Sequence, residues 1–370
     1  MAKSQEFLPL FKCLAGRIGQ NGSYIRHSLA SGKKVEMVRS VPNIESALHE
    51  TFGIIKSKEA AVIRTLNEIQ AIDHRVVHGC SRFITSIMAD NGVVEAIQEN
   101  AGSAPLHNPA NVVGIEFCRK LLPHVPNVAV FDTAAHKAMP LKAYLYGLPI
   151  ELYEKHGIRR YGFQGISHNY VAKEAANILQ KPFECLKIIT CHLGNGSSVT
   201  AFKNGKSIDT SMGMTPIEGV MMATRSGDID PAIIPYLIEV VGFSLAEVKD
   251  MLIKRSGLLG LCGESDMRDI IKLAENGNDK AQTAIDVFIY RIQKYIGSYT
   301  AAMNGVDVII FIAGIGENCS CLRKRILENF EYLGLKIDEA RNEHNDTIFS
   351  AGNSDIYAMV IPTNEELAIA

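Results

Sequence analysis

The stretch KIITCHLGNGSSVTAFKNGKSIDTS, residues 187–211, decides the fold that this sequence predicts. Its first part, 187–193, is the mainly apolar run expected of a buried strand. A glycine- and serine-rich segment follows, and two alternating runs are then joined by Asn204-Gly205, a strong hairpin signal. We predict that His192–Ser198 is a strand–turn–strand segment, in which glycine backbone and serine hydroxyls bind phosphate oxygens.

Two further short apolar runs predict strands, one at 128–132 and one at 307–313. Each leads directly into glycine or polar residues. Because ligands of α/β sheets bind at the carboxyl ends of strands, the segments after Asp132, Leu193 and Ala313 are the first places to expect a site.

Helical patterns alternate with these runs, which indicates an α/β chain. Ser244 and Glu247 form a capping box that predicts a helix running to Arg255, with Gly257 as its C-terminal stop. The spacing of apolar residues predicts a long amphipathic helix over 281–296. We place the domain boundary near Asp132 to Pro140.

Three segments could bring backbone N–H groups to phosphate: 192–198, the turn-rich run 209–231, and Gly314–Asn318, predicted as a turn between a strand and a helix beginning near Cys321. A GxxxxGK[ST] motif is absent, and Cys319 interrupts the glycine pattern of dinucleotide-binding proteins. The sequence therefore disfavours a P-loop kinase or an NAD enzyme. It favours a phosphate-handling hairpin fold of the actin, Hsp70 and sugar-kinase type.

Composition excludes several other classes of protein. The chain has 370 residues, enough for two domains, and a formal net charge of -2, which predicts no nucleic-acid partner and no membrane partner. We recognise no signal peptide and expect a cytoplasmic enzyme. The eight cysteines include no CxxC pair and are expected to be reduced. His74 and His78 share a segment with no third metal ligand nearby, so we favour a structural role for both.

The order of ten motifs resembles the acetate kinase family from about residue 70 to the end, and more loosely before it. The motifs are HRVVHG (74–79), PLHNPAN (105–111), FDTAAH (131–136), RRYGFQGISH (159–168), HLGNGSS (192–198), DTSMGMTPIEGVMMATRSGDIDP (209–231), SGLLG (256–260), SDMR (265–268), AGIGEN (313–318) and IPTNEELAIA (361–370). The run at 209–231 is the most specific of them.

This resemblance implies a two-domain α/β fold of the actin, Hsp70 and sugar-kinase type, with its active site in the interdomain cleft. The implied N-terminal domain is 1–134 and the nucleotide-binding domain 135–362, with a C-terminal helix, 363–370, returning to the first domain. The implied reaction is reversible phosphoryl transfer between ATP and acetate, giving acetyl phosphate and ADP. ATP and Mg²⁺ (or Mn²⁺) are the implied cofactors, and a homodimer the implied assembly.

Site residues carry over by position from the matched motifs. The implied catalytic residues are Asp132, Gln164 and Arg225, and the implied substrate-binding residues are Arg75 and His107. Glu365 is the implied magnesium-linked carboxylate. The implied nucleotide contacts are His192, Leu193, Gly194, Asn195, Gly196, Asp266, Met267, Arg268, Gly314, Ile315, Gly316, Glu317 and Asn318. Phosphoryl transfer depends mainly on positioning and on charge stabilisation, for which arginine forks are well suited.

The chain departs from the family pattern at two places. Family members open with a hairpin and an Asn-Xaa-Gly-Ser-Ser-Ser-type turn, and no residue before Arg17 matches it. Gln164 stands where the family has a histidine; an amide can donate a hydrogen bond but cannot become cationic. Two alternatives therefore stay open: a catalytically impaired relative that binds nucleotide or acyl phosphate, and a kinase of propionate or butyrate.

Overall fold

The computed structural model describes residues 9–60, 62–79, 82–83, 85–103 and 107–369. The described residues form two compact units. The first comprises those within 1–79, 85–131 and 369–370, and the second comprises those within 80–84 and 132–368.

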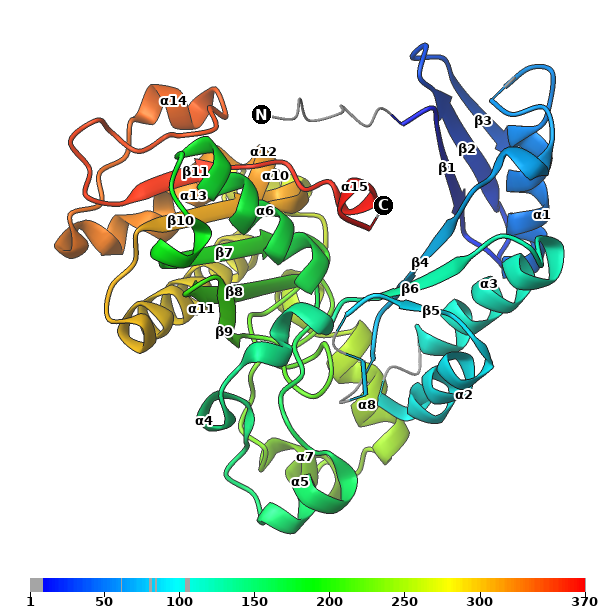
Figure 1. Cartoon of the computed structure of the whole chain (residues 1–370). Helices are drawn as coiled ribbons and strands as arrows, with labels where there is room; N and C mark the ends of the chain where they lie inside the picture. The colour runs from blue at the N-terminus through cyan, green and yellow to red at the C-terminus, as the bar shows by residue number, and fades with distance from the viewer. Residues whose placement is uncertain (1–8, 61, 80–81, 84, 104–106, 370) are drawn as a thin grey trace. The chain divides into compact units, whose positions relative to one another are not determined.

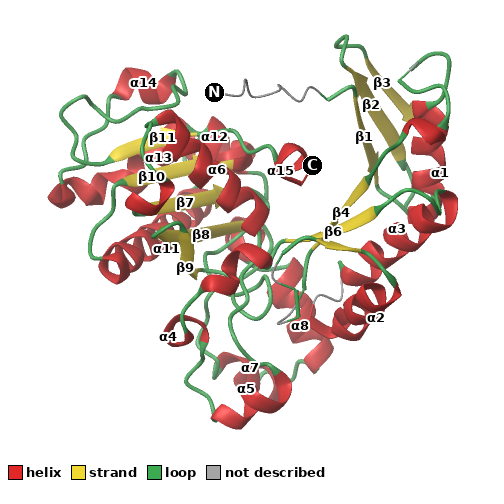
Figure 2. Cartoon of the chain, viewed as in Figure 1, coloured by secondary structure: helices red, strands yellow, loops and turns green. Residues whose placement is uncertain are grey.

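The first unit contains two small sheets (Figures 1 and 2). An antiparallel sheet has the order β1-β2-β3, and a mixed sheet has the order β4-β6-β5, with β4 parallel to β6. Helix α3 packs on β4 and β6 and also contacts α1 and α2. The bounds are β1 (Phe11–Gly16), β2 (Tyr24–Leu29), β3 (Lys34–Val38), α1 (Ile44–Ile55), β4 (Ile72–Val76), β5 (Ile87–Met88), α2 (Asn91–Glu99), α3 (Asn108–Leu121) and β6 (Asn127–Phe131).

The second unit is built on a five-stranded sheet of order β11-β10-β7-β8-β9. Strands β7, β10 and β11 run parallel, whereas β7, β8 and β9 are joined as antiparallel hairpins. The bounds are β7 (Ile188–Leu193), β8 (Ser197–Lys203), β9 (Lys206–Thr210), β10 (Val308–Ile312) and β11 (Tyr357–Val360). Asn204 and Gly205 both have positive φ, as a two-residue hairpin turn requires, so the predicted hairpin is confirmed.

Helices cover both faces of this sheet, which explains why its strands read as apolar runs rather than alternating ones. Ile189, Cys191 and Leu193 of β7 pack in one cluster with α11 (Asp279–Met303). Ile188 of the same strand packs in a second cluster with Val171 and Ala175 of α6 (Gly165–Ile178). Figure 1 shows these two helices on either side of the strands. The predicted α/β class is confirmed, and the helix predicted over 281–296 lies within α11.

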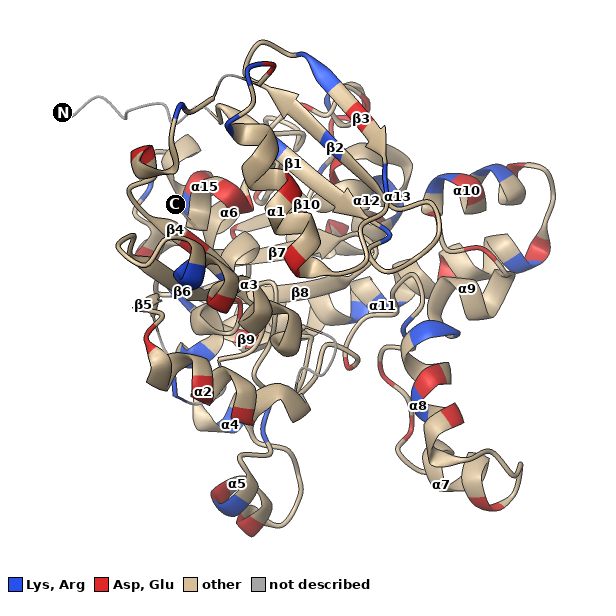
Figure 3. Cartoon of the chain, turned by 90° about the vertical axis from the view of Figure 1, so that its right-hand side faces the viewer, with Lys and Arg blue, Asp and Glu red and all other residues tan. Residues whose placement is uncertain are grey.

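Shorter helices lie in the second unit, except that Ile369 at the end of the last helix belongs to the first. Their bounds are α4 (Leu141–Tyr144), α5 (Ile150–His156), α7 (Ile233–Glu239), α8 (Leu245–Lys254), α9 (Gly257–Cys262), α10 (Met267–Glu275), α12 (Ala313–Asn318), α13 (Ser320–Leu327), α14 (Glu339–Glu343) and α15 (Glu365–Ile369). Basic and acidic side chains are interspersed along α8 and α10 (Figure 3), where ion pairs such as Lys254–Asp250 and Lys272–Asp269 form.

Two local predictions are wrong. Gly314–Asn318 lies inside helix α12 rather than in a turn, because the change from β10 to helix occurs at Ala313, which has a left-handed φ of 65°. Gly257 does not stop α8, which ends at Lys254 with Arg255 as its C-cap. Instead, Gly257 opens α9 with a φ of +64°.

Candidate active site

The turn between β7 and β8 lies at the carboxyl end of the parallel strands. His192 of β7 pairs with Ile312, the last residue of β10, so both strands end at the same edge of the sheet. The buried Ser197 hydroxyl braces the turn by accepting from the Gly194 N–H (3.2 Å) and donating to the Gly194 carbonyl (3.1 Å). Asn195 at its tip is exposed. The predicted strand–turn–strand segment is therefore confirmed.

Gln164 lies directly against this turn. It is the residue before α6, has a left-handed φ of 58°, and is half-buried. Its Oε1 accepts a hydrogen bond from the Ser198 hydroxyl at 2.5 Å. Its Nε2 lies 3.5 Å from the carbonyl oxygen of Gly196, at the limit of a hydrogen bond. The side-chain amide is thus fixed by β8 on its oxygen side and only loosely held on its nitrogen side.

Arg225 approaches the same glycine. A Cβ added to Gly196 would be 3.4 Å from Gln164 Nε2 and 3.7 Å from Arg225 Nη1. The guanidinium donates to the Pro216 carbonyl at 3.0 Å. Burial lowers the pKa of Arg225 from its usual value, although the group remains a cation at neutral pH. Gln164, Gly196 and Arg225, predicted from three separate motifs, are therefore neighbours.

The loop that carries Arg225 depends on Gly257. A Cβ at Gly257 would lie 2.1 Å from the carbonyl oxygen of Met222 and 2.7 Å from that of Arg225. The Arg225 carbonyl accepts the Met222 N–H at 3.1 Å, which closes the loop. Only glycine permits both this close approach and the positive φ, so SGLLG (256–260) packs directly beneath the arginine loop.

Asp132 is held at the start of α6. Its side chain is buried, with 1% exposure of the residue, and its carbonyl accepts the Gly165 N–H at 3.0 Å. A Cβ at Gly165 would lie 2.2 Å from that carbonyl oxygen. The close approach of Gly165 places the backbone of Asp132 next to the residue that follows Gln164.

Helix α12 is connected to the segment that leads to Glu365. The Glu317 carboxylate accepts N–H groups from Ala313 at 2.8 Å and from Thr363 at 3.2 Å. The Thr363 hydroxyl lies 3.0 Å from that of Ser167, which lies 2.9 Å from His192 Nδ1. Glu365 follows two residues later as the first residue of α15 and is half-buried. Glu317 thus braces this region through its carboxylate.

Three buried imidazoles support the region from beneath. The ring centroids of His136 and His168 lie 6.1 Å apart, and those of His168 and His192 lie 5.9 Å apart. Burial lowers the pKa of His136 to about 4 and lowers that of His168 well below its usual value, so both rings are neutral at pH 7.

The hydrogen bonds of His168 define its tautomer. The Ser198 hydroxyl donates to Gln164 and therefore accepts at 2.7 Å from His168 Nε2. Nδ1 of the same ring is then an acceptor for the Thr190 hydroxyl, also at 2.7 Å. A chain of hydrogen bonds thus runs from β7 through His168 and Ser198 to the Gln164 amide, and it fixes that amide's oxygen.

The remaining predicted residues lie elsewhere. Arg75 is on β4 of the first unit with an exposed side chain, and His107 precedes α3 and is half-buried. Asp266 caps α10; its carboxylate binds Arg268, which lowers the pKa of Asp266 to about 2. Arg268 is 86% exposed, whereas Met267 is buried in the core.

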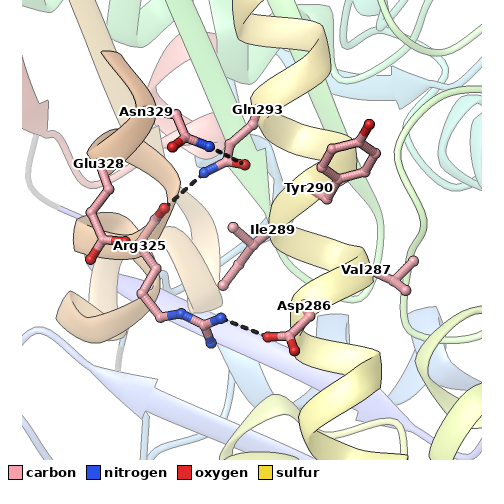
Figure 4. Close-up of a pocket in the computed structure, with 8 residues that line it drawn as sticks. All are labelled: Asp286, Val287, Ile289, Tyr290, Gln293, Arg325, Glu328 and Asn329. Carbon is pink, nitrogen blue, oxygen red and sulfur yellow. Dashed lines mark hydrogen bonds and ion pairs between the residues drawn. The ribbon is translucent and has the colours of Figure 1, made fainter. Parts of the chain in front are cut away.

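Two surface hollows in the described part of the chain are lined by none of the predicted site residues. One of about 500 Å³ lies beside α11 and the segment after α13, and several of its polar groups pair with one another (Figure 4). Arg325 binds Asp286 at 2.6 Å, and Gln293 donates to the Arg325 carbonyl at 2.9 Å. Another, of about 760 Å³, lies in the first unit around Asp90 and Arg119.

The described part of the chain contains neither a ready-made cluster of metal ligands nor a membrane-spanning helix. Within those residues, no three His, Cys, Asp or Glu side chains are grouped as they would be to hold a metal ion by themselves. His74 instead uses Nε2 to bind Asn127 at 2.7 Å. None of the described helices has both the length and the apolar character that a membrane-spanning segment needs.

Sequence reasoning missed the residues that brace the site. Ser167 and Thr363 lie inside matched motifs, but small hydroxyl residues give no signal of a contact between distant segments. Arg160 binds Glu218 and the carbonyl oxygens of Thr210 and Ser211, at 2.7 and 3.0 Å for the latter two, and so organises the run 209–231. The opposite charges of Arg160 and Glu218 in two matched motifs were the only available signal.

Comparison with known proteins gives consistent matches. A family model described as the Acetokinase family matches residues 2–370. The chain is 52% identical over 363 residues to acetate kinase of Carboxydothermus hydrogenoformans, covering 98% of this chain and 91% of that protein. The match thus extends well before residue 70. Crystal structures of Porphyromonas gingivalis acetate kinase (40% identity, 97% and 91% coverage) and a Francisella tularensis propionate kinase (41%, 98% and 91%) each superpose with a TM-score of 0.92.

Proposed function

This chain belongs to the acetokinase family, and on that basis we propose that it is an acetate kinase, which transfers a phosphoryl group reversibly between ATP and acetate. The observation that carries the proposal is the meeting of Gln164, the glycine turn and Arg225 at the carboxyl end of β7, in a chain half identical to curated acetate kinases. The N–H groups of a glycine turn and an arginine cation can stabilise a transferring phosphoryl group, because its charge is spread over its oxygens.

The side chains have distinct roles in this proposal. Arg225 is a half-buried fork that neutralises charge developing on the transferring phosphoryl group, and Arg75 binds the carboxylate substrate or its acyl phosphate. Gln164 donates from Nε2, the less tightly held end of its amide. Acetate is already ionised and needs no general base, so Asp132 serves as an orienting residue. His107 contributes to the wall of the acyl site.

The nucleotide would be held by three segments. The turn from His192 to Gly196 offers backbone N–H groups to the phosphates, and α12, including Gly314 to Asn318, begins at the adjoining strand end. Asp266 to Arg268 is the third. The exposed Arg268 fork is fixed in place by the Asp266 carboxylate, so it can stack on or bind the nucleotide without a large loss of side-chain freedom.

Magnesium fits the residues present. Mg²⁺ prefers oxygen ligands, and in nucleotide enzymes it needs only one or two carboxylates besides phosphate oxygens and water. Glu365, half-buried beside the segment that Glu317 and Ser167 fix, would be such a carboxylate. The ion would neutralise phosphate charge; Mn²⁺ has compatible ligand preferences.

A homodimer is the proposed assembly. Five large apolar residues between 233 and 245 are exposed: Ile233, Tyr236, Val240, Val241 and Leu245. Exposed apolar patches of this kind mark interaction surfaces. Val240→Asp should convert a dimer into a monomer in light-scattering measurements, whereas Val38→Asp, at an exposed valine of the first unit, should leave the mass unchanged. A wild-type chain that is already monomeric would contradict the assembly.

The preference for one short-chain acid over another depends on the size of the acyl site. A propionate kinase has the same fold and 41% identity, so propionate is the second candidate substrate. One methylene changes discrimination by only about 1–3 kcal/mol. We expect acetate to have the higher kcat/KM, measured side by side with propionate and butyrate.

The experiment that tests the function is ADP production from ATP, Mg²⁺ and acetate by the purified chain. Arg225→Ala should lower kcat/KM by about 10²–10³-fold, because one preorganised charge donor is lost. Arg341→Ala, at a half-exposed arginine of α14, is the matched control and should change little. Nucleotide binding without turnover on any short-chain acid would instead support the catalytically impaired alternative.

A further inference from the structure

Two thiols meet at the junction of α12 and α13. Cys319 is the single residue between the two helices, with non-helical φ and ψ of -117° and 83°. Cys321 is the second residue of α13 and is exposed. Their Sγ atoms lie 3.3 Å apart, in hydrogen-bond contact. The pair is therefore a preformed dithiol that solvent can reach, rather than two isolated core cysteines.

Groups around the pair favour a thiolate on Cys321. The hydrogen bond from Cys319 is the largest cause that lowers the pKa of Cys321 to about 6, with support from N–H groups at the start of α13 and from Arg325. The same hydrogen bond raises the pKa of Cys319. The exposed sulfur is thus the nucleophile, and the half-buried one keeps its proton.

We propose that Cys319 and Cys321 are a redox-modification site, which a small disulfide such as oxidised glutathione converts into an intramolecular disulfide. The Cys321 thiolate attacks one sulfur of the small disulfide, whose S–S bond breaks and releases one thiolate. Cys319 then attacks Cys321 Sγ, the second small thiolate leaves, and the Cys319–Cys321 bond forms. Two protein thiols are oxidised, one small disulfide is reduced to two thiols, and the two protons end on those thiols.

Closing this bond would disturb α12. A disulfide brings its sulfurs to about 2 Å and its Cβ atoms to about 4 Å, so the junction must shift from the 3.3 Å contact. Arg323, two residues after Cys321 on α13, is fully buried and holds the last carbonyls of α12: Nη1 donates to Gly316 O at 2.9 Å and to Glu317 O at 3.0 Å. Movement of the first turn of α13 is therefore transmitted to the end of α12.

This coupling gives the modification a consequence, and that consequence rests on the proposed function. Because α12 is a proposed nucleotide contact, the disulfide form should have a several-fold higher KM for ATP, with a smaller change in kcat. Reduction should restore the original KM. The modification itself requires no kinase activity.

The modification is tested by mass spectrometry of the whole chain equilibrated in glutathione buffers of rising oxidised fraction. The peptide with 319 and 321 should lose two hydrogen atoms. Cys185, exposed in another segment, is the matched internal control and should gain glutathione instead. Cys319→Ser should leave a stable glutathione adduct on Cys321, since no resolving thiol remains. A pair that stays reduced, or that carries only glutathione in the wild-type chain, would overturn the proposal.

The coupling is tested separately by ATP titration of the oxidised and reduced protein, with the Cys319→Ser, Cys321→Ser double variant as the control. The double variant should keep one KM under both conditions. An unchanged KM in fully oxidised wild-type protein would overturn the coupling while leaving the disulfide established. Loss of the two hydrogens in a chain without kinase activity would separate failure of the proposed function from failure of the modification.

Discussion

Gln164 occupies a backbone position that few residues adopt. Its φ of 58° is left-handed, a region in which histidine is several-fold enriched among non-glycine residues. The position is nevertheless well fixed, because Ser198 and the neutral His168 hold the amide oxygen in place. The local backbone is therefore compatible both with glutamine and with the histidine that the resemblance to the family implies, and of the two only an imidazole can become cationic.

Gln164→His tests that difference. An imidazole donor acts on charge that develops in the transition state, so kcat should rise while ATP affinity changes little. The gain should lie between a few-fold and about 10³-fold, depending on how well the glutamine amide already donates. Steady-state kinetics with saturating acetate measure it. Flat or reduced turnover in a folded variant would mean that Gln164 is a packing substitution.

Gly165 and Gly297 form a matched pair of helix glycines. A Cβ at Gly165 would lie 2.2 Å from the Asp132 carbonyl, whereas a Cβ at Gly297 of α11 meets nothing within 4 Å. Gly165→Ala should therefore destabilise the chain by about 2 kcal/mol or more and lower activity by displacing α6 from Asp132. Gly297→Ala should be stabilising by about 0.5–1 kcal/mol because alanine is the better helix former.

Urea unfolding followed by circular dichroism measures both free energies. Equal effects of the two substitutions would show that the close approach at Asp132 relaxes without cost. Activity measured on the same preparations separates a stability effect from a displacement of the site.

At the scale of elements, the sequence predicted the strands well and the segment after β10 badly. Apolar runs such as 187–193 and 307–313 are buried on both faces of the sheet, and this requirement is visible in composition. By contrast, nothing in the sequence announces that Ala313 takes a left-handed φ, because alanine rarely does. The Glu317 carboxylate accepts the Ala313 N–H, a contact that only the folded chain reveals.

Helices α12 and α13 depend on Arg323. This fully buried guanidinium donates to the carbonyls of Gly316, Glu317 and Asn342 and to the side chains of Asn342 and Asn345, all at 3.0 Å or less. Arg323→Met should cost about 3–5 kcal/mol, because several buried acceptors lose their donor. Arg325→Met on the same helix removes only a surface pair with Asp286 and should cost less than about 1 kcal/mol.

Denaturant midpoints of the two variants provide the comparison. If Arg323→Met unfolds at the wild-type midpoint, the buried arginine network contributes nothing net to stability. Retained stability with a raised KM for ATP would instead place Arg323 as a positioning residue for α12.

At the scale of the whole molecule, the resemblance to a known family predicted more of the function than the residue patterns did. The family and the reaction follow from ten ordered motifs and are supported by 52% identity to a curated acetate kinase, whereas the α/β class already follows from the alternation of strand and helix patterns. The residue pattern indicated the phosphate-binding segments, but it could not predict that Gln164 and Arg225 lie near Gly196. Their proximity depends on the conformation of loops, which have no regular hydrophobic period. The predicted domain bounds at 134 and 362, and the roles of all the predicted site residues, stay predictions.

The buried histidines predict how stability depends on pH. His136 titrates near pH 4 in the folded chain but near its ordinary 6.5 when unfolded, and the pKa of His168 is lowered further by burial. Between these values the unfolded state binds more protons, so the free energy of unfolding falls as pH falls from about 6.5. His136 alone should cost roughly 3 kcal/mol by pH 4, at about 1.4 kcal/mol per pH unit.

Urea unfolding between pH 7.5 and 4.5 measures this slope, and His136→Gln is the variant that isolates one contribution. Its amide can still bond to Ser207 and the Phe163 carbonyl, which His136 contacts at 3.0 Å each, but it does not titrate. The variant should therefore lose stability less steeply than wild type below pH 6.5, whatever its stability at pH 7.5. Carboxylates such as Asp266, whose pKa is lowered to about 2, contribute equally to variant and wild type, so the difference between the two slopes isolates His136. Parallel slopes for variant and wild type would show that His136 binds protons equally in the folded and unfolded chains, which contradicts the lowered pKa.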